Sequence, residues 1–214
     1  MKKSIKNFID FYEKAEKLKT TTRHSWLSNP KRQESTAEHS WMLGLMAMIL
    51  ADEIRPKVNL LKVLKMVIIH DLAEAITGDI PSHEVSMRNI KANKKRAEKK
   101  AIKSIVKKLP KEKGNEIFSL WKEMEENKTQ EAHFSHSLDK IEAILQHNVA
   151  SISTWRQGDF FINPYYKDYF FDFDNFMRTF KDIVDNQTME KIIKAKKTHK
   201  VEAKHMERYK KNNK

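Results

Sequence analysis

Four separated positions carry side chains that commonly bind divalent metals: His39, the dipeptide His70-Asp71, and Asp139. The chain has no cysteine, so any metal must be held by imidazole and carboxylate groups. Two imidazoles and two carboxylates suit Mn, Co, Zn or Fe, and they leave coordination positions for water and a substrate oxygen. An ion held in this way polarises a phosphoryl oxygen and lowers the pKa of its bound water. These residues therefore predict a metal-dependent hydrolase.

Each of these residues also has a purely structural explanation when it is taken alone. His39 and His70 can be core imidazoles with ordinary hydrogen bonds, and Asp71 and Asp139 can be helix caps or salt-bridge partners. Short motifs match by chance often enough that the surrounding segments must decide. All four side chains lie in stretches with the apolar periodicity of amphipathic helices.

The first of these helices has a clear start. Ser35 and Glu38 match the capping box, in which the serine hydroxyl accepts from the backbone N–H of Glu38 and the Glu38 carboxylate accepts from Ser35. We expect the helix to carry His39 in its first turns and to stop before Pro56. Its largely apolar sequence predicts deep burial.

A second helix is predicted over residues 60–76, with Gly78 as its C-terminal cap. His70 and Glu74 are four residues apart and would share one face of this helix. Asp71 is rotated from His70 by about 100° and can flank the same pocket. One helix end therefore gathers an imidazole and two carboxylates.

The remaining periodicity is also helical, so we expect an all-α fold of about six to eight helices without strands. Further helices are predicted at 85–109, at 112–126, from about 129 and from about 189. Asp139 lies beside the apolar stripe of the helix that starts near 129. Residues 159–171 are rich in Phe and Tyr and should pack against the core.

The chain length fits one domain, residues 1–186, followed by a basic helical tail, residues 187–214. The formal net charge of +13 is concentrated in residues 88–113, which carry +10, and in the tail, which carries +7. The basic run at 88–113 lacks the interleaved aromatic residues that stack on bases, so we interpret it as a solvated helix face. Nucleic acid is therefore not expected as a partner. For the tail, membrane-surface binding, a partner contact and solubility all stay open.

The N-terminal residues lack the apolar core of a signal peptide, and no stretch approaches the ~20 apolar residues of a membrane span. We expect a soluble, cytoplasmic protein.

In their order and context, the four ligand candidates resemble those of the HD-domain metal-dependent phosphohydrolases, and especially the branch of 5′-deoxynucleotidases. The resemblance covers about residues 18–150 and rests on three segments: ESTAEHS at 34–40, HDLAEAITGDIP at 70–81 and LDKIE at 138–142. It implies an HD-domain helical bundle with a central metal cleft. It also implies removal of the 5′-phosphate from (deoxy)nucleoside monophosphates by a metal-activated water.

The same resemblance assigns residue roles. It implies that His39, His70, Asp71 and Asp139 hold one divalent transition metal, with Mg possible. It makes Glu74 the residue that orients or deprotonates the attacking water, or that protonates the leaving oxygen.

The resemblance also implies a set of substrate-binding residues. Arg23 would hold the phosphate and Trp26 would pack on the nucleotide, although His24 or Arg32 could serve in place of this pair. Asp79 would lie near the sugar. A surface arginine, a core tryptophan and a turn-forming aspartate are the structural alternatives.

One metal is expected, because Ile69 stands where some relatives have a further histidine. His83, His133 and His136 lie near the ligand segments in sequence, but we interpret them as structural. Many small relatives are dimers, so a homodimer is expected, and the aromatic residues after Gly158 could serve its interface.

Two alternatives to a 5′-deoxynucleotidase stay open. The first is an HD phosphohydrolase that acts on another nucleotide or phosphoester. The second is a non-catalytic protein that binds nucleotides or nucleic acid, in which the metal is structural.

Overall fold

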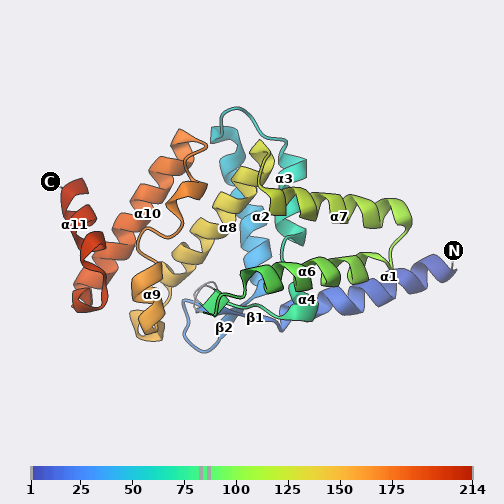
Figure 1. Ribbon diagram of the computed structural model, residues 1–214, viewed down its shortest axis with the longest axis horizontal. Coiled ribbons are helices and arrows are strands. Elements are labelled where there is room, and N and C mark those ends of the chain that lie inside the picture. Colours follow the sequence, from blue (N-terminus) through green and yellow to red (C-terminus); the bar gives the residue numbers. More distant parts are fainter. Residues whose placement is uncertain (1, 82–83, 86–87, 214) are drawn as a thin grey trace.

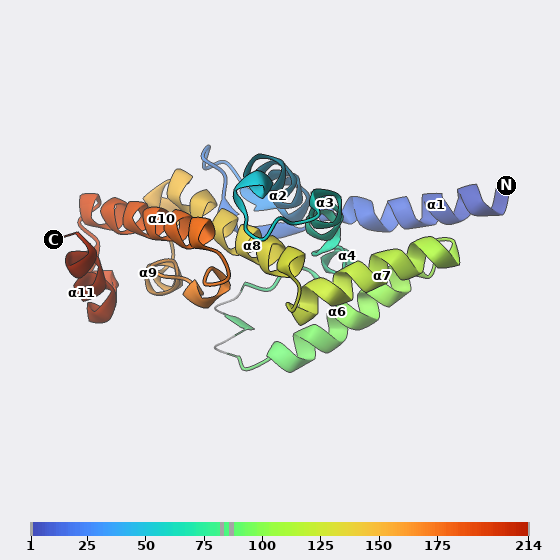
Figure 2. The same cartoon turned by 90° about the horizontal axis from the view of Figure 1, so that it is seen from above.

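Helices dominate the architecture of the chain. The computed structural model describes residues 2–81, 84–85 and 88–213, and this part contains eight helices of ten residues or more, as predicted. The molecule is elongated (Figures 1 and 2). The N-terminus lies at the free end of α1 (Lys2–Ala15), and the C-terminus lies at the opposite end beside α11 (Ala203–Asn212).

Helix α8 (Gln130–Val149) lies at the centre of the fold. Helix α8 packs against α2 (Thr36–Leu50), α3 (Leu60–Ile69) and α10 (Asn175–Lys194). Their apolar faces form the main core, which includes the buried side chains of Leu43, Val63, Val67, Phe134, Leu138, Ile141 and Val184. Helix α8 therefore contacts most of the elements that build the site described below.

A second, smaller core lies on the other side of the ligand segments. Helices α6 (Lys91–Val106) and α7 (Lys111–Glu126) lie side by side in both views (Figures 1 and 2). Ile102, Ile105 and Trp121 from these helices pack with Leu72, which follows the His70-Asp71 dipeptide.

The predicted helix starts are confirmed where a capping signal marks them. The capping box of Ser35 and Glu38 is complete, and α2 begins at Thr36. Thr129 accepts a hydrogen bond from the backbone N–H of Ala132 and caps α8. Helix α7 ends at Glu126, as predicted, and the left-handed Asn127 follows it.

The prediction of one helix over 60–76 is wrong. Helix α3 ends at Ile69, a turn carries the His70-Asp71 dipeptide, and the short α4 (Glu74–Thr77) follows. The predicted cap is confirmed, because Gly78 has φ +71° and its N–H donates to the carbonyl of Glu74. The basic helix is also shorter than the predicted 85–109, since α6 spans Lys91–Val106.

A hairpin corrects the expectation that the chain has no strands. Strands β1 (Thr22–Trp26) and β2 (Gln33–Ser35) pair in antiparallel register, with Thr22 opposite Ser35. Both strands are short and polar, so they lack the apolar alternation that would reveal them in the sequence. The hairpin joins the N-terminal segment to the start of α2.

Helix α2 is not deeply buried, contrary to the prediction. Leu43 and Ala47 are buried, but the opposite face exposes Trp41, Met48 and Ile49. A helix that is apolar on all sides is usually surrounded by other elements. Here only one face meets the described part of the chain.

The aromatic segment packs against the core, as predicted. Short helix α9 (Gln157–Ile162) buries Phe160, and Phe171 lies in the main core. Phe161 and Tyr169 remain exposed.

The helical stretch predicted from about 189 begins earlier and is interrupted between Lys194 and Ala203. Helix α10 starts at Asn175, not near 189, and runs through the predicted division after residue 186, which stays a prediction. Arg208 from α11 forms an ion pair with Asp168 and lies 4.0 Å from the ring centroid of Tyr165. These contacts hold the end of the chain against the body of the protein.

No helix in the described ranges combines the length and apolar character that crossing a membrane requires. The cytoplasmic location stays a prediction.

Candidate functional site

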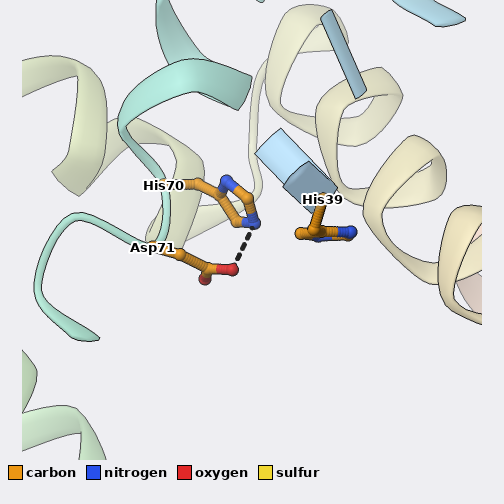
Figure 3. Close-up of side chains that lie close together, drawn as sticks. All are labelled: His39, His70 and Asp71. Atoms are coloured by element: carbon orange, nitrogen blue, oxygen red, sulfur yellow. Dashed lines mark ion pairs between the residues drawn. The ribbon is translucent and has the colours of Figure 1, made fainter. Parts of the chain in front are cut away.

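Three separate elements bring potential metal ligands together. His39 comes from the first turns of α2, and the His70-Asp71 dipeptide comes from the turn between α3 and α4. Figure 3 shows His39 on one side and His70 with Asp71 on the other. One ligand atom from each of the three residues lies within 4.8 Å of the other two.

Asp139, from the middle of α8, lies at the same cluster. Its Oδ1 is 3.2 Å from Nε2 of His39 and 4.0 Å from Nε2 of His70. The structure therefore brings together all four residues that the sequence singled out, although they are up to 100 positions apart along the chain.

The hydrogen bonds of His70 fit a bound cation. Its Nδ1 lies 2.8 Å from the carbonyl oxygen of Val67, which can only accept, so Nδ1 carries the proton. Nε2 is buried and finds no hydrogen-bond partner among the described residues, yet it lies 2.9 Å from Oδ2 of Asp71. A buried ring nitrogen without a hydrogen bond, beside a carboxylate oxygen, leaves both groups available to hold a metal ion.

His39 is oriented in a similar way by a carboxylate behind it. Its Nδ1 lies 2.5 Å from Oε2 of Glu142, and this contact directs Nε2 toward Asp139. Burial and the charge of Arg23 lower the pKa of His39. Glu142 and Asp139 raise it by a larger amount, so that the pKa of His39 is about 10. The two carboxylates therefore favour a positive charge at this position.

A second cluster with metal-ligating groups shares His39. It consists of Glu34, His39 and Glu142, all of which are buried. Burial, with the charge of Glu142, raises the pKa of Glu34 to about 7. None of these three residues is among the described residues that line the adjoining cavity, whereas Asp71 and Asp139 of the first cluster are. We therefore assign it a supporting role behind the first cluster.

Arg23 links the two clusters. Its Nε lies 3.3 Å from Glu34, and its Nη1 lies 3.4 Å from Asp71. Burial lowers the pKa of Arg23, but Asp71 and Glu142 raise it well above its ordinary value. Strand β1 holds this permanent positive charge at the edge of the cluster.

A cavity opens beside the four ligand candidates. Asp71 and Asp139 lie in its wall together with Arg23, Glu74 and Asp79. The described residues that complete the wall are His24, Ser25, Ile80, Pro81, Lys94, Lys140, Ala143, Ile144, His147, Asp159, Ile162, Asn163 and Tyr166. A substrate in this cavity can therefore contact the metal cluster and charged groups of both signs.

Glu74 is buried at this wall. One carboxylate oxygen accepts a hydrogen bond from the Thr36 hydroxyl at 3.4 Å, and the other lies 3.7 Å from Nζ of Lys94. Burial, followed by the charges of Asp71 and Asp79, raises the pKa of Glu74 to about 10. Burial and the neighbouring carboxylates therefore favour the protonated form of Glu74.

The sequence interpretation missed two cations. Lys94 pairs with Glu98 and faces Glu74, and Lys140 pairs with Asp139. Burial lowers the pKa of each lysine, but the adjacent carboxylates raise it above the ordinary value. Lys140 follows directly after a predicted ligand, which is a usable signal, whereas Lys94 is one of many lysines in α6.

Glu142 and Glu34 were also not assigned a role from the sequence, although both lie in the segments that carried the resemblance. Glu142 is three residues after Asp139 and shares its helix face, which is the signal that could have identified it.

Only some of the residues predicted to bind substrate line the cavity. Asp79 lines the cavity, and burial raises its pKa. Trp26 is not among the described residues that line it. Arg32 is exposed and pairs with Glu38 at 2.5 Å, while His24 lines the cavity and lies 2.8 Å from Asp159.

Two of the other histidines make structural contacts. His133 donates from Nε2 to the carbonyl of Asn127 at 2.9 Å, and His136 donates to that of Met124 at 2.7 Å. Burial, with the charge of Lys140, lowers the pKa of His136 to about 4, so this ring is neutral. His83 lies outside the described residues.

Comparisons with known proteins place these observations in a family context. The sequence model of the HD domain matches residues 15–175. The chain is 35% identical over 148 residues to 5′-deoxynucleotidase HDDC2 of Dictyostelium discoideum, covering 66% of this chain and 76% of the relative. It is 33% identical over 143 residues to 5′-deoxynucleotidase HDDC2 of Homo sapiens, covering 66% of this chain and 67% of that relative.

A solved structure is similar over most of its length. The predicted metal-dependent phosphohydrolase from Magnetospirillum magnetotacticum MS-1 superimposes with a TM-score of 0.75 at 26% identity, covering 88% of this chain and 94% of that one.

Proposed function

Because the chain belongs to the HD-domain family, we propose that it is a metal-dependent phosphohydrolase that removes the 5′-phosphate from (deoxy)nucleoside monophosphates. One observation carries the proposal: a cluster of two imidazoles and two carboxylates adjoins a cavity whose wall also contains Arg23, Lys94 and Lys140. The relatives that are named 5′-deoxynucleotidases support this substrate class.

We assign His39, His70, Asp71 and Asp139 as the residues that would hold one divalent ion. Mn, Co, Zn and Fe suit this ligand set, and Mg is possible. A bound ion would polarise a phosphoryl oxygen and lower the pKa of a water molecule.

The cationic side chains are suited to hold a phosphate dianion. The planar guanidinium of Arg23 can donate two parallel hydrogen bonds to phosphate oxygens. Its contact with Asp71 places these donors beside the metal cluster. Lys94 and Lys140 add positive charge at the same wall and attract the substrate.

Glu74 is suited to move a proton during the reaction. It lines the cavity close to Asp71 and is held by Thr36 and Lys94. We assign its carboxyl group the protonation of the leaving 5′ oxygen, and in its ionised form it can orient the attacking water.

Asp79 is the candidate for a contact with the sugar. It lines the cavity in the turn after α4, where a carboxylate can accept from a sugar hydroxyl. The contact of Trp26 with the nucleotide stays a prediction, because its side chain does not line this cavity.

The direct test is phosphate release from a panel of deoxy- and ribonucleoside 5′-monophosphates. Metal-stripped protein would be assayed alone and after Mn, Co, Zn or Mg is restored. We expect release only with metal, its loss in Asp71→Ala, and a decrease of roughly 100- to 10,000-fold in Glu74→Gln. Glu53→Gln, at an exposed carboxylate, is the matched control and should retain full activity.

Two results would overturn the proposal in different ways. Stoichiometric metal binding without phosphate release from any monophosphate would exclude a 5′-nucleotidase; release of pyrophosphate or triphosphate from other nucleotides would then identify another HD phosphohydrolase. A non-catalytic binding protein would bind metal and nucleotide in the wild type and in Glu74→Gln alike, with no turnover in either.

We also propose a homodimer, formed through the exposed face of α2. Trp41, Leu45, Met48 and Ile49 lie on this face at helical spacing, and a large apolar patch on a monomer usually marks an interface. Helix α1 has a similar exposed stripe: Ile5, Phe8, Ile9 and Tyr12.

Sedimentation of variants tests the dimer. Trp41→Glu should sediment as a monomer, because it places a charge in the proposed interface. Tyr169→Glu is the matched control, since both side chains are 65% exposed and Tyr169 lies after Gly158, outside α2. Dissociation by the Tyr169 variant alone would move the interface to the aromatic segment.

A further inference from the structure

An amide without a partner lies in the wall of the cavity, away from the charged cluster. Asn163, at the end of α9, is only 5% exposed and lines the cavity. Its Nδ2 is buried and finds no hydrogen-bond partner among the residues that the structure describes. A buried donor left without a partner destabilises the folded protein. A donor kept in this state is available to a ligand.

Helix α8 shows how far the cavity extends. Asp139, Ala143 and His147 are spaced by four residues, lie on one face of α8 and all line the cavity. With a rise of 1.5 Å per residue, His147 lies about 12 Å along the helix from Asp139. The cavity therefore runs along α8 from the metal cluster to the residues of α9. A nucleotide with its phosphate near Asp139 would extend its base toward His147.

The chemical character of the wall changes along this path. Near Asp139 the wall is highly charged, whereas toward α9 it contains Ile144, Ile162, His147 and Asn163. The carboxylate of Asp159 also lies at this end, where it is paired with His24 at 2.8 Å. Burial, with the charges of His24 and Arg23, lowers the pKa of His147 to about 4, although Asp159 opposes this shift, so the ring is neutral. Apolar side chains with a few neutral hydrogen-bonding groups suit a nucleobase, which is flat, uncharged and polar at its edge.

We propose that Asn163 recognises the hydrogen-bonding edge of the nucleobase and makes this enzyme selective among bases. The amide offers one donor group and one acceptor group in a plane, which matches the paired groups on a base edge. Asn163 lies beyond residues 18–150, where the sequence resembled the 5′-deoxynucleotidases. The inference rests on the proposed function, because it requires a nucleotide substrate in this cavity.

The test compares substrates with and without a base. The value of kcat/KM would be measured for the deoxynucleoside 5′-monophosphates and for 2-deoxyribose 5-phosphate. In Asn163→Ala the value of kcat/KM should fall about 10-fold for the preferred nucleotide. For 2-deoxyribose 5-phosphate, kcat/KM should stay at the wild-type value. The loss should appear mainly in KM, because the contact lies away from the bond that breaks.

Two further variants sharpen the result. Asn163→Asp keeps the side-chain volume but removes the donor, so it should change the order of preference among the bases. Asn115→Ala, at an exposed position on α7 outside the cavity wall, is the matched control and should keep the wild-type order.

A second measurement needs no variant and therefore does not depend on folding of the Asn163 proteins. With the wild-type enzyme, nucleotides whose base lacks its exocyclic oxygen or amino group should lose about 10-fold in kcat/KM. Equal turnover of these analogues would overturn the inference, as would an equal loss for 2-deoxyribose 5-phosphate in Asn163→Ala. In both cases phosphate release itself would continue, so the proposed function would stand. Absence of release from every monophosphate would instead reject both.

Discussion

At the scale of single residues, the second nitrogen of each histidine ligand candidate determines what the first can do. Nδ1 of His70 donates to the carbonyl of Val67, and Nδ1 of His39 is held by Glu142. Both contacts leave Nε2 directed toward the carboxylates of the cluster. Such partners behind the ligands fix the tautomer and strengthen metal binding.

Removal of the Glu142 charge should therefore weaken metal binding. We expect Glu142→Gln to lower the affinity for the ion by about 10- to 100-fold, because a neutral amide holds the His39 ring less firmly. Competition with a coloured chelator would measure the change. Glu53→Gln should bind metal as the wild type does, and an unchanged affinity in Glu142→Gln would show that His39 does not depend on this carboxylate.

His147 should make folding stability depend on pH. Its pKa is about 4 in the folded protein, below the ordinary value of 6.5. Between pH 6.5 and pH 4 the unfolded state binds more protons than the folded state, so the free energy of unfolding falls as the pH decreases. Between pH 7 and pH 5, the protonation of His147 alone should lower the free energy of unfolding by about 2 kcal/mol.

Urea unfolding at pH 7 and at pH 5 would isolate this contribution. From pH 7 to pH 5, the free energy of unfolding should fall by about 2 kcal/mol more in the wild type than in His147→Gln. His199→Gln, at an exposed histidine, should retain the wild-type dependence. Equal losses in the wild type and in His147→Gln would contradict the prediction.

The segments around His39, His70-Asp71 and Asp139, through their resemblance to a known family, were sufficient to single out the metal cluster among the histidines and carboxylates of the chain. They were not sufficient for Asn163 and His147. Neither residue lies in a recognisable motif, and their position in the cavity wall depends on how α9 packs against the rest of the fold. That packing is a tertiary property that no local pattern contains.

At the scale of elements, the turn at His70-Asp71 is the main departure from the prediction. Residues 60–77 favour helix throughout, so local propensity indicates one continuous element. The structure interrupts it, and Asp71 and Glu74 thereby both reach the cavity wall. The hairpin was missed for the opposite reason, because its strands are too short and polar for a periodic signal. Capping residues predicted helix starts well, since their hydrogen bonds are local.

Gly78 should be essential for the turn that follows α4. It has φ +71° and ψ 163°, a region that only glycine adopts readily. We expect Gly78→Ala to destabilise the protein by about 1–3 kcal/mol and to raise KM, because Asp79, Ile80 and Pro81 follow directly and line the cavity.

Gly44→Ala provides the matched control for this substitution. Gly44 lies inside α2, and a Cβ there would meet no described atom within 4 Å. The free energy of unfolding of Gly44→Ala should exceed that of the wild type by about 0.5–1 kcal/mol. Urea midpoints of the two variants should therefore shift in opposite directions, and a stable Gly78→Ala protein would exclude strain at this turn.

At the scale of the whole molecule, the metal cluster brings together parts of the chain that are far apart in the sequence. α2, the turn after α3, and α8 each contribute to it. An ion that binds only the folded state should stabilise the protein by about 2.7 kcal/mol at a concentration 100 times its Kd. This corresponds to a rise in Tm of roughly 5–10 °C for a chain of this size.

Calorimetry of metal-stripped protein, with and without added Mn, would measure this effect. Asp71→Ala should show a much smaller rise, whereas Glu53→Gln should match the wild type. An equal rise in Asp71→Ala would place the stabilising ion elsewhere.

The walls of the cavity come from residues as far apart as Arg23 and Tyr166. Most helices can form from local contacts, but this cavity requires loops of more than 100 residues to close, which is a slow step in folding. A ribosome-bound chain that has reached only α8 would contain every metal ligand candidate and lack the wall made by α9. The proposed selectivity for the base would therefore depend on residues that are synthesised after every metal ligand candidate.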